Sequence, residues 1–307
     1  TTDVEFLPAG LPGRLSLFRR AASYDAVFLQ KRLLGSLELS VLRYFARRLV
    51  FDLDDAVMYD GSGLPDRRRQ NRFRAVVRAA DLVICGNSIL ADEVLAVSQQ
   101  SPVVIPTAID ADLFHPRMRT ASPGPGQPVT IGWTGSRSTA RYLGELFPVL
   151  ARLGSNVRLK VISDSVESLN VEELGPVPLE FIPWSTEVEV SAAATFDIGL
   201  MPLPDDPWTR GKCGFKALQY MSLGIPAVCS PVGANCEILD HGQAGFLPAT
   251  ADEWYSVLIR LSDNARLRQT TGQAGRQRIE SIYDVRIQAP LLVAAVEQTC
   301  HQAVRVA

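Results

Sequence analysis

The chain has 307 residues, of which 47% are hydrophobic and 21% are charged, and its formal net charge is −2. This length is long for a single core and sufficient for two domains of about 150 residues each. The small net charge gives no reason to expect a nucleic-acid partner, and every apolar run is far shorter than the roughly 20 residues of a membrane span.

In the first half of the chain, short apolar runs alternate with segments of helical periodicity. The start of the chain, Thr1–Leu7, reads as a second strand rather than a first, with no glycine-rich loop before Asp3, so we expect a truncated form. Four strands are expected at Ala26–Leu29, Leu49–Asp52, Leu82–Cys85 and Val103–Pro106, with helices at Leu37–Arg48 and Asn71–Ala80. Pro116–Pro128, which is rich in proline and glycine and has no periodicity, is expected to be a linker.

The second half repeats this alternation. Strands are expected at Thr130–Trp133, Leu159–Ile162, Leu179–Ile182, Ile198–Met201 and Ile225–Cys229, and a final helix at Val285–Val306. Such alternation predicts an α/β fold in which crossover helices connect parallel strands. Ligands of such sheets bind beyond the carboxyl ends of the strands, so we expect a substrate cleft between the two domains.

The five cysteines, Cys85, Cys213, Cys229, Cys236 and Cys300, are scattered without the spacing of metal ligands. They are expected to be free thiols in a reducing compartment. We therefore expect a cytoplasmic protein without a signal peptide and with at most peripheral contact with the inner face of the membrane.

The segment from Gly211 to Gly233 is the most informative of the chain. It predicts a polar loop, an amphipathic helix, a short buried strand and a glycine turn. Lys212 and Lys216 lie near the start of that helix, where free N–H groups and the positive end of the helix dipole favour anions. This combination is typical of a phosphate or diphosphate site.

A second glycine loop, Gly132–Arg137, runs from a strand into a helix that is expected to begin near Thr139. Gly135 and Ser136 form an anion cradle in this interpretation, with Arg137 or Arg141 as the cation. A glycine loop of this kind is a weak signal alone and gains weight from the segment around Lys216.

The run Leu218–Val228 resembles the donor-binding segment of retaining nucleotide-sugar glycosyltransferases of family 4 type, known as glycosyl transferases group 1. Lys216, Gln219, Tyr220 and Met221 match one branch of that family, written Lys-x-x-Glu-Tyr-Met. The resemblance implies the GT-B fold, in which two Rossmann-like domains face a central cleft. It implies an acceptor-side domain at 1–118, a donor-binding domain at 119–285, and a helix at 286–307 that crosses back to the first domain.

By this resemblance the protein moves a sugar from a nucleoside diphosphate, UDP or GDP, to a glycan, lipid or small-molecule acceptor. Retention of anomeric configuration is implied, and no metal and no cofactor is expected. Two departures from the family pattern stand out. Gln219 replaces the glutamate that binds the donor ribose, and Gly211 stands where the family has its first glutamate, so Lys212 is the nearest substitute for that contact.

The expected site residues fall into three groups. The catalytic group is Lys216, Lys212, Asp54 and Asp55. The donor-binding group is Gly135, Ser136, Arg137, Gly214, Phe215, Lys216, Ala217, Gln219 and Gly233. The acceptor-side group is Gln30 and Lys31, in place of a histidine that the family often has there.

The acidic run Asp52–Asp55 ends a buried strand and invites a metal-binding interpretation. We reject the metal because an Asp-x-Asp metal motif serves the single-domain class of glycosyltransferases. The open alternatives are acceptor-binding or base-like carboxylates, and a helix cap with a salt-bridged surface pair.

Two further features remain open. The basic residues Arg67, Arg68, Arg69, Arg72, Arg74 and Arg78 suit a solvated surface, or else contact with an anionic membrane or a phosphorylated acceptor. Trp184 either fills the core or packs against the nucleotide base.

Two other functions remain as alternatives to the transferase. One is a sugar-nucleotide-binding protein with weak catalysis, which Gln219, Gly211 and the absent first glycine loop favour. The other is a sugar-nucleotide epimerase, which would need acidic and histidine residues that this sequence does not assemble.

Overall fold

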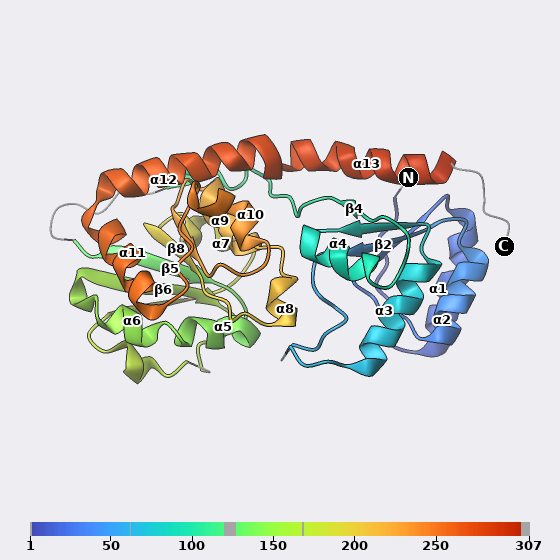
Figure 1. Ribbon diagram of the computed structural model, residues 1–307, viewed down its shortest axis with the longest axis horizontal. Helices are drawn as coiled ribbons and strands as arrows, with labels where there is room; N and C mark the ends of the chain where they lie inside the picture. The colour runs from blue at the N-terminus through green and yellow to red at the C-terminus, as the bar shows by residue number, and fades with distance from the viewer. Residues whose placement is uncertain (1, 62, 120–126, 168, 302–307) are drawn as a thin grey trace. The chain divides into compact units, whose positions relative to one another are not determined.

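The computed structural model describes residues 2–61, 63–119, 127–167 and 169–301, which form two compact α/β units (Figure 1). Unit 1 comprises Thr1–Thr107, Asp206–Cys213 and Ala289–Ala307, and unit 2 comprises Ala108–Asp205 and Gly214–Gln288. The first unit therefore ends 11 residues before the expected boundary at 118, and it includes a segment, 206–213, that was assigned to the second domain. Most of the expected linker, residues 120–126, lies outside the described residues.

Unit 1 contains a four-stranded parallel sheet of order β1-β2-β3-β4. Its strands are β1 Val27–Gln30, β2 Leu49–Leu53, β3 Leu82–Cys85 and β4 Val103–Val104. Alternate residues of β2 point to opposite faces, as the pleat requires, so Phe51 packs on one side of the sheet and Val50 on the other. Both faces are covered, which is the usual condition for an all-parallel sheet.

Helices from both ends of the chain cover this sheet. They are α1 Leu11–Arg20, η1 Ala21–Ser23, α2 Ser36–Phe45, α3 Arg67–Ala79, α4 Ser88–Leu95, α8 Pro207–Arg210 and the larger part of α13 Val285–His301. Phe51 contributes to a core with side chains of α2, α3 and α4. On the other face, Val50 and Ile84 pack with Leu292 and Val296 of α13, as Figure 1 shows for the helix that runs along this sheet.

Two expectations in unit 1 were wrong. Residues 2–7 form no strand. Helix α3 begins at Arg67 rather than Asn71, because Asp66 caps it and accepts hydrogen bonds from the N–H groups of Arg68 and Arg69. The basic run is therefore the first turn of a helix.

Unit 2 contains a five-stranded parallel sheet of order β7-β6-β5-β8-β9. Its strands are β5 Val129–Thr134, β6 Val157–Ser163, β7 Leu179–Pro183, β8 Ile198–Met201 and β9 Ala227–Cys229. Every expected strand from Ala26–Leu29 to Ile225–Cys229 is confirmed to within two residues at each end.

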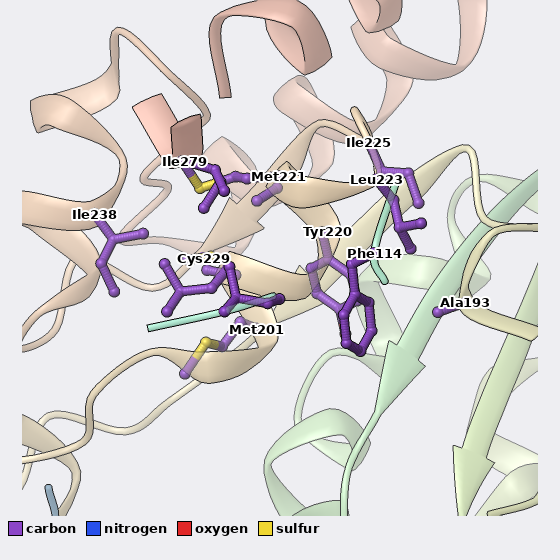
Figure 2. Packing of buried hydrophobic residues seen from close by; sticks show 14 of the residues in the cluster. Phe114, Ala193, Met201, Tyr220, Met221, Leu223, Ile225, Cys229, Ile238 and Ile279 are labelled. Carbon is purple, nitrogen blue, oxygen red and sulfur yellow. The ribbon is translucent and has the colours of Figure 1, made fainter. Parts of the chain in front are cut away.

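Many short helices surround the second sheet. The α-helices are α5 Arg137–Gly144, α6 Phe147–Ala151, α7 Glu189–Ala193, α9 Phe215–Ser222, α10 Asn235–Ile238, α11 Ala251–Asp263 and α12 Ala265–Arg278, followed by a π-helical turn, η6 Ile279–Tyr283. The 3₁₀ turns are η2 Pro116–Met118, η3 Gly154–Asn156, η4 Val171–Leu174 and η5 Asp240–Gly242. One face of the sheet packs against α5, α6 and α11, and α9 lies at the centre of the other core, which Figure 2 shows.

Two glycines let α9 and Phe196, which lies two residues before β8, approach this sheet closely. Gly132 of β5 and Gly199 of β8 are direct neighbours across the two strands. A Cβ atom on Gly132 would lie 2.0 Å from the ring of Phe196, and one on Gly199 would lie 2.3 Å from the ring of Tyr220. The aromatic rings therefore occupy the space that side chains at these positions would need.

The Tyr220 hydroxyl is fully buried and takes part in two hydrogen bonds. It accepts from the Thr134 N–H at 3.1 Å and donates to the Leu200 carbonyl at 3.2 Å. We expect Tyr220→Phe to lower the stability of unit 2 by about 1–3 kcal/mol, because it leaves a buried amide without a partner. Thermal unfolding followed by tryptophan fluorescence measures the change.

Tyr44→Phe is the matched control, since the Tyr44 side chain is 83% exposed. Equal melting temperatures for the two variants would contradict the assigned role of the Tyr220 hydroxyl.

Candidate functional site

In unit 2 the two expected phosphate-binding segments lie against each other. A Cβ atom on Gly135 would lie 2.8 Å from Cε of Lys216, so the Lys216 side chain passes directly beside the loop after β5. The Lys216 ammonium lies 5.5 Å from the centre of the Trp133 ring. Both segments follow carboxyl ends of strands, β5 and β8, where parallel sheets bind their ligands.

Helix α9 begins beside this loop. Its N-cap residue, Gly214, has φ +66°, a conformation that favours glycine, and a Cβ atom there would also lie 2.3 Å from Ile238. The first N–H groups of the helix, those of Phe215, Lys216 and Ala217, have no acceptor within the helix. The dipole of α9 and the Lys216 ammonium thus act in the same direction and favour an anion.

Tyr220 connects the two segments, and the sequence named it only as part of the Lys-x-x-Glu-Tyr-Met pattern, without a role in the site. Its ring lies on α9, and its hydroxyl accepts a hydrogen bond from Thr134, the residue immediately before Gly135. The loop and the helix start are therefore fixed relative to each other by one buried side chain. The sequence indicates this role only indirectly, because Tyr220 falls on the apolar face of the expected helix.

Ser136 and Arg137 lie where the loop enters α5, which begins at Arg137 rather than near Thr139. The Arg137 N–H donates to Asp164 at 2.5 Å, and this bond lowers the pKa of that carboxyl. The Ser136 hydroxyl lies 2.8 Å from that of Ser138, and the Arg137 side chain is 62% exposed and 4.0 Å from Glu167. Asp164, which the sequence did not single out, thus caps the loop.

Gln219, expected to bind the donor ribose, is 2% exposed. Its amide nitrogen donates a 2.7 Å hydrogen bond to the carboxylate of Glu189, which is the first residue of α7 and is partly exposed. Gln219, which the sequence predicted as a ligand-binding residue, is therefore buried behind the Glu189 carboxylate, which the sequence analysis did not name.

Gly233 lies in the turn after β9 and has φ +59°. The Cys236 N–H donates to its carbonyl at 3.4 Å, and the same turn is closed by a bond from the Asn235 amide to the Ser230 carbonyl. Trp184, which directly follows β7, is 47% exposed and so does not fill the core.

A second group of charged residues lies in unit 1, just beyond β1 and β2. The Lys31 ammonium is 2.7 Å from Asp54 and 3.2 Å from Asp55, and the Lys212 ammonium is 3.9 Å from Asp55. Lys31 has φ +55°, a conformation that costs energy in a residue with a side chain and that clusters at functional sites. Lys212 thus belongs to unit 1, whereas Gly135 and Lys216 belong to unit 2.

The lysines occupy the carboxylates that a metal ion would need. Across residues 2–61, 63–119, 127–167 and 169–301, no three His, Cys, Asp or Glu side chains gather into a potential metal site. The salt-bridged pair that the sequence left open is thus present, between the lysines and Asp54 and Asp55.

Asp52, on β2, is half-buried and lies near Asp54. Burial, and to a smaller degree the charge of Asp54, raises the pKa of Asp52 to about 6, while Lys31 and a hydrogen bond from Gln30 oppose the shift. Gln30 is the register partner of Asp52 on β1, so this acceptor-side residue contacts the acidic run directly.

Gly211 has no room for the glutamate of the family pattern. A Cβ atom there would lie 2.4 Å from that of Ala56 and 3.0 Å from the Leu90 side chain. The Asn87 amide, which is buried, donates to the Gly211 carbonyl at 3.2 Å and to Cys213 Sγ at 3.4 Å. Asn87 therefore holds the 211–213 loop in unit 1. The sequence indicates this role of Asn87 only through the Gly-Asn-Ser run after β3.

The chain was compared with known proteins. Residues 129–264, from β5 to α11, match the family described as glycosyl transferases group 1. No curated protein sequence matches the chain. Among the helices in the described part of the chain, none is long and apolar enough to cross a membrane.

Solved structures of glycosyltransferases resemble the whole chain. Sucrose-phosphate synthase from Thermosynechococcus elongatus aligns with a TM-score of 0.76 at 17% identity, over 94% of this chain and 77% of that one. HepE of Anabaena in complex with UDP aligns with a TM-score of 0.73 at 17% identity, over 94% of this chain and 82% of that one. A UDP-forming α,α-trehalose-phosphate synthase from Burkholderia xenovorans aligns with a TM-score of 0.70 at 12% identity, over 95% of this chain and 79% of that one.

These similarities define the class of the protein. Its fold is the GT-B fold, as the sequence resemblance implied. The match to glycosyl transferases group 1 covers the segment that carries Gly135, Lys216 and Gly233, and this match supports a transferase enzyme.

The raised pKa of Asp52 makes stability depend on pH. Because its folded pKa of about 6 exceeds the ordinary value of 3.8, the carboxyl favours the folded state at low pH, and this contribution is lost as pH rises through 6. We expect Asp52→Asn to melt at a higher temperature than the wild type at pH 7.5, with a smaller difference at pH 4.5.

Asp25→Asn is the control, because the Asp25 side chain is 85% exposed. The interpretation fails if the difference between Asp52→Asn and the wild type is the same at both pH values.

Proposed function

We propose that the protein transfers a sugar from a UDP-sugar to an acceptor hydroxyl, with retention of anomeric configuration and without a metal. The observation that carries this proposal is the contact of Lys216 with the Gly135 loop at the start of α9. HepE, whose structures contain UDP and UDP-glucose, supports uracil as the donor base. The resemblance to retaining enzymes supports the stereochemistry.

In the proposed reaction the bond between the sugar and the diphosphate breaks, and negative charge grows on the leaving diphosphate. The Lys216 ammonium and the N–H groups at the start of α9 stabilise that charge, and the Gly135 loop lets the phosphates approach the backbone. These groups supply the positive charge that a metal ion supplies in other transferases. They are already in place before the donor binds, since Tyr220 fixes loop and helix, so little reorganisation accompanies the reaction.

The charged group of unit 1 serves the acceptor in this proposal. Asp54 and Asp55 accept hydrogen bonds from acceptor hydroxyls, and Lys31 and Lys212 hold the two carboxylates in place. The oxygens of a carboxylate accept hydrogen bonds, which is the role that a hydroxyl donor requires.

Glu189 takes the part of the missing ribose-binding glutamate. Gln219 is buried and cannot reach a ligand in the solvent, but its amide orients the partly exposed Glu189 carboxylate at 2.7 Å. Trp184, exposed beyond the neighbouring strand β7, is available to pack on the base.

The weakly catalytic alternative has one specific observation in its favour. Gly211 replaces a glutamate of the family pattern, and its surroundings leave no room for a side chain. A protein of that kind would bind UDP-glucose without releasing UDP when candidate acceptors are added, so a UDP-release assay separates the two functions.

The first prediction from this proposed function concerns the donor nucleotide. We expect UDP to raise the melting temperature more than GDP, ADP or dTDP, because a ligand that binds only the folded state stabilises it. Lys216→Ala should weaken UDP binding by about tenfold to a hundredfold, the loss expected for a hydrogen bond to a charged group.

Arg152→Ala, which removes an exposed cation of unit 2 paired with Asp252, is the control and should bind UDP like the wild type. No shift with any nucleotide, on the wild type, would refute the donor site.

The second prediction concerns the ribose. We expect Glu189→Gln to lower the affinity for UDP about tenfold and to leave the affinity for 2′,3′-dideoxy-UDP unchanged, because only the ribose hydroxyls contact this carboxylate. Isothermal titration calorimetry measures both affinities. Glu187→Gln, an exposed carboxylate two residues away, is the control, and an equal loss for both nucleotides would contradict the assignment.

A further inference from the structure

Unit 1 contains a polar cavity of about 620 Å³ that the proposed reaction does not use. It lies among α1, α2, the loop after β1 and the start of α3. Six cationic side chains line it, namely Arg14, Lys31, Arg32, Arg68, Arg69 and Arg72. Only two carboxylates do so, Glu38 and Asp66, which leaves an excess of four positive charges in a chain whose net charge is −2.

Part of this positive charge is balanced inside the cavity wall. Arg14 pairs with Glu38 at 2.6 Å, and Arg69 pairs with Asp66 at 3.5 Å. The pKa of Glu38 is lowered by a hydrogen bond from the Gly35 N–H, by Arg14 and, from farther away, by Arg72. Glu38 is thus held as an anion and fixes the arginines beside it.

Arg32 and Arg68 are not balanced in this way. Both are exposed, and within the described part of the chain neither has a carboxylate at ion-pair distance. The backbone contributes little, because Asp66 already accepts from the N–H groups at the start of α3. The cavity therefore attracts anions through its side chains.

The cavity borders the acceptor-side residues. Lys31 lines the cavity and also forms ion pairs with Asp54 and Asp55, so only the Lys31 side chain separates those carboxylates from the cavity. Lys31 directly follows the last residue of β1, which places the cavity at the carboxyl edge of the unit 1 sheet. This is the edge at which parallel sheets bind their ligands.

We propose that this cavity binds the phosphate group of a small phosphorylated acceptor, such as a sugar monophosphate. The proposal rests on the proposed transferase function and names the class of its acceptor. Arginine forks bind phosphate oxygens in pairs, and a dianion balances the excess charge better than a carboxylate. A volume of about 620 Å³ suits a small molecule and excludes a flat docking surface.

The experiment compares two double variants of equal charge. Arg32→Ala with Arg68→Ala removes two exposed cations of the cavity that have no carboxylate at ion-pair distance among the described residues. Arg67→Ala with Arg74→Ala, the control, removes two exposed cations of α3 that do not line it. Isothermal titration calorimetry measures binding of inorganic phosphate, glucose 6-phosphate and glucose to each variant and to the wild type.

We expect the wild type and the control to bind both phosphates and not glucose, with an affinity that falls as NaCl rises. The cavity variant should lose at least tenfold in affinity for both phosphates and should keep its affinity for UDP. Equal phosphate affinity in all three proteins would overturn the proposal. So would phosphate binding that Lys216→Ala abolishes, because the anion would then occupy the donor site.

A failure of the transferase function gives a different pattern, in which the wild type does not bind UDP but the cavity still binds phosphate. Vesicles of phosphatidic acid and phosphatidylcholine test a lipid as the source of the phosphate. Cosedimentation that needs Arg32 and Arg68, without binding of glucose 6-phosphate, would overturn the small acceptor in favour of a lipid.

Discussion

The buried hydroxyl of Tyr220 makes the interaction on which the proposed donor site of unit 2 depends. It joins α9 to the last residue of β5 and so fixes Lys216 beside the Gly135 loop. This contact between α9 and β5 needs a glycine at position 199, because a Cβ atom there would collide with the Tyr220 ring. The Tyr220 ring and the glycine at position 199 thus bring together the two segments of the proposed donor site, which are about 80 residues apart in the sequence.

Unit 1 uses charge where unit 2 uses helix and loop geometry. Asp54 and Asp55 are paired with Lys31 and Lys212, and burial, with a smaller effect of the Asp54 charge, raises the pKa of Asp52 at the end of β2. Lys31 connects this acidic group to the arginine-lined cavity. The positive charge of the cavity and the carboxylates of Asp54 and Asp55 beside it suit a ligand that carries both a phosphate and hydroxyl groups.

Most of the fold was predictable, since buried parallel strands are continuous apolar runs that alternate with helices. The expected start of α3 was wrong because the arginine run hid the cap at Asp66. Gly135, Gly214 and Lys216 could be proposed from the sequence because a glycine loop and a lysine at a helix start are local signals. Glu189, Asp164 and Asn87 were missed, since each acts on a residue at least 25 positions away.

The sequence by itself determined the fold class and the strands, and it predicted the two segments of the proposed donor site, because periodicity and glycine chemistry act within a few residues. Only the tertiary structure decided that Gln219 is buried behind Glu189, that Lys212 belongs with Asp55, and that six cations from separate elements line one cavity. The reason is physical. Burial, ion pairing and cavities arise from side chains that the fold brings together across long stretches of chain.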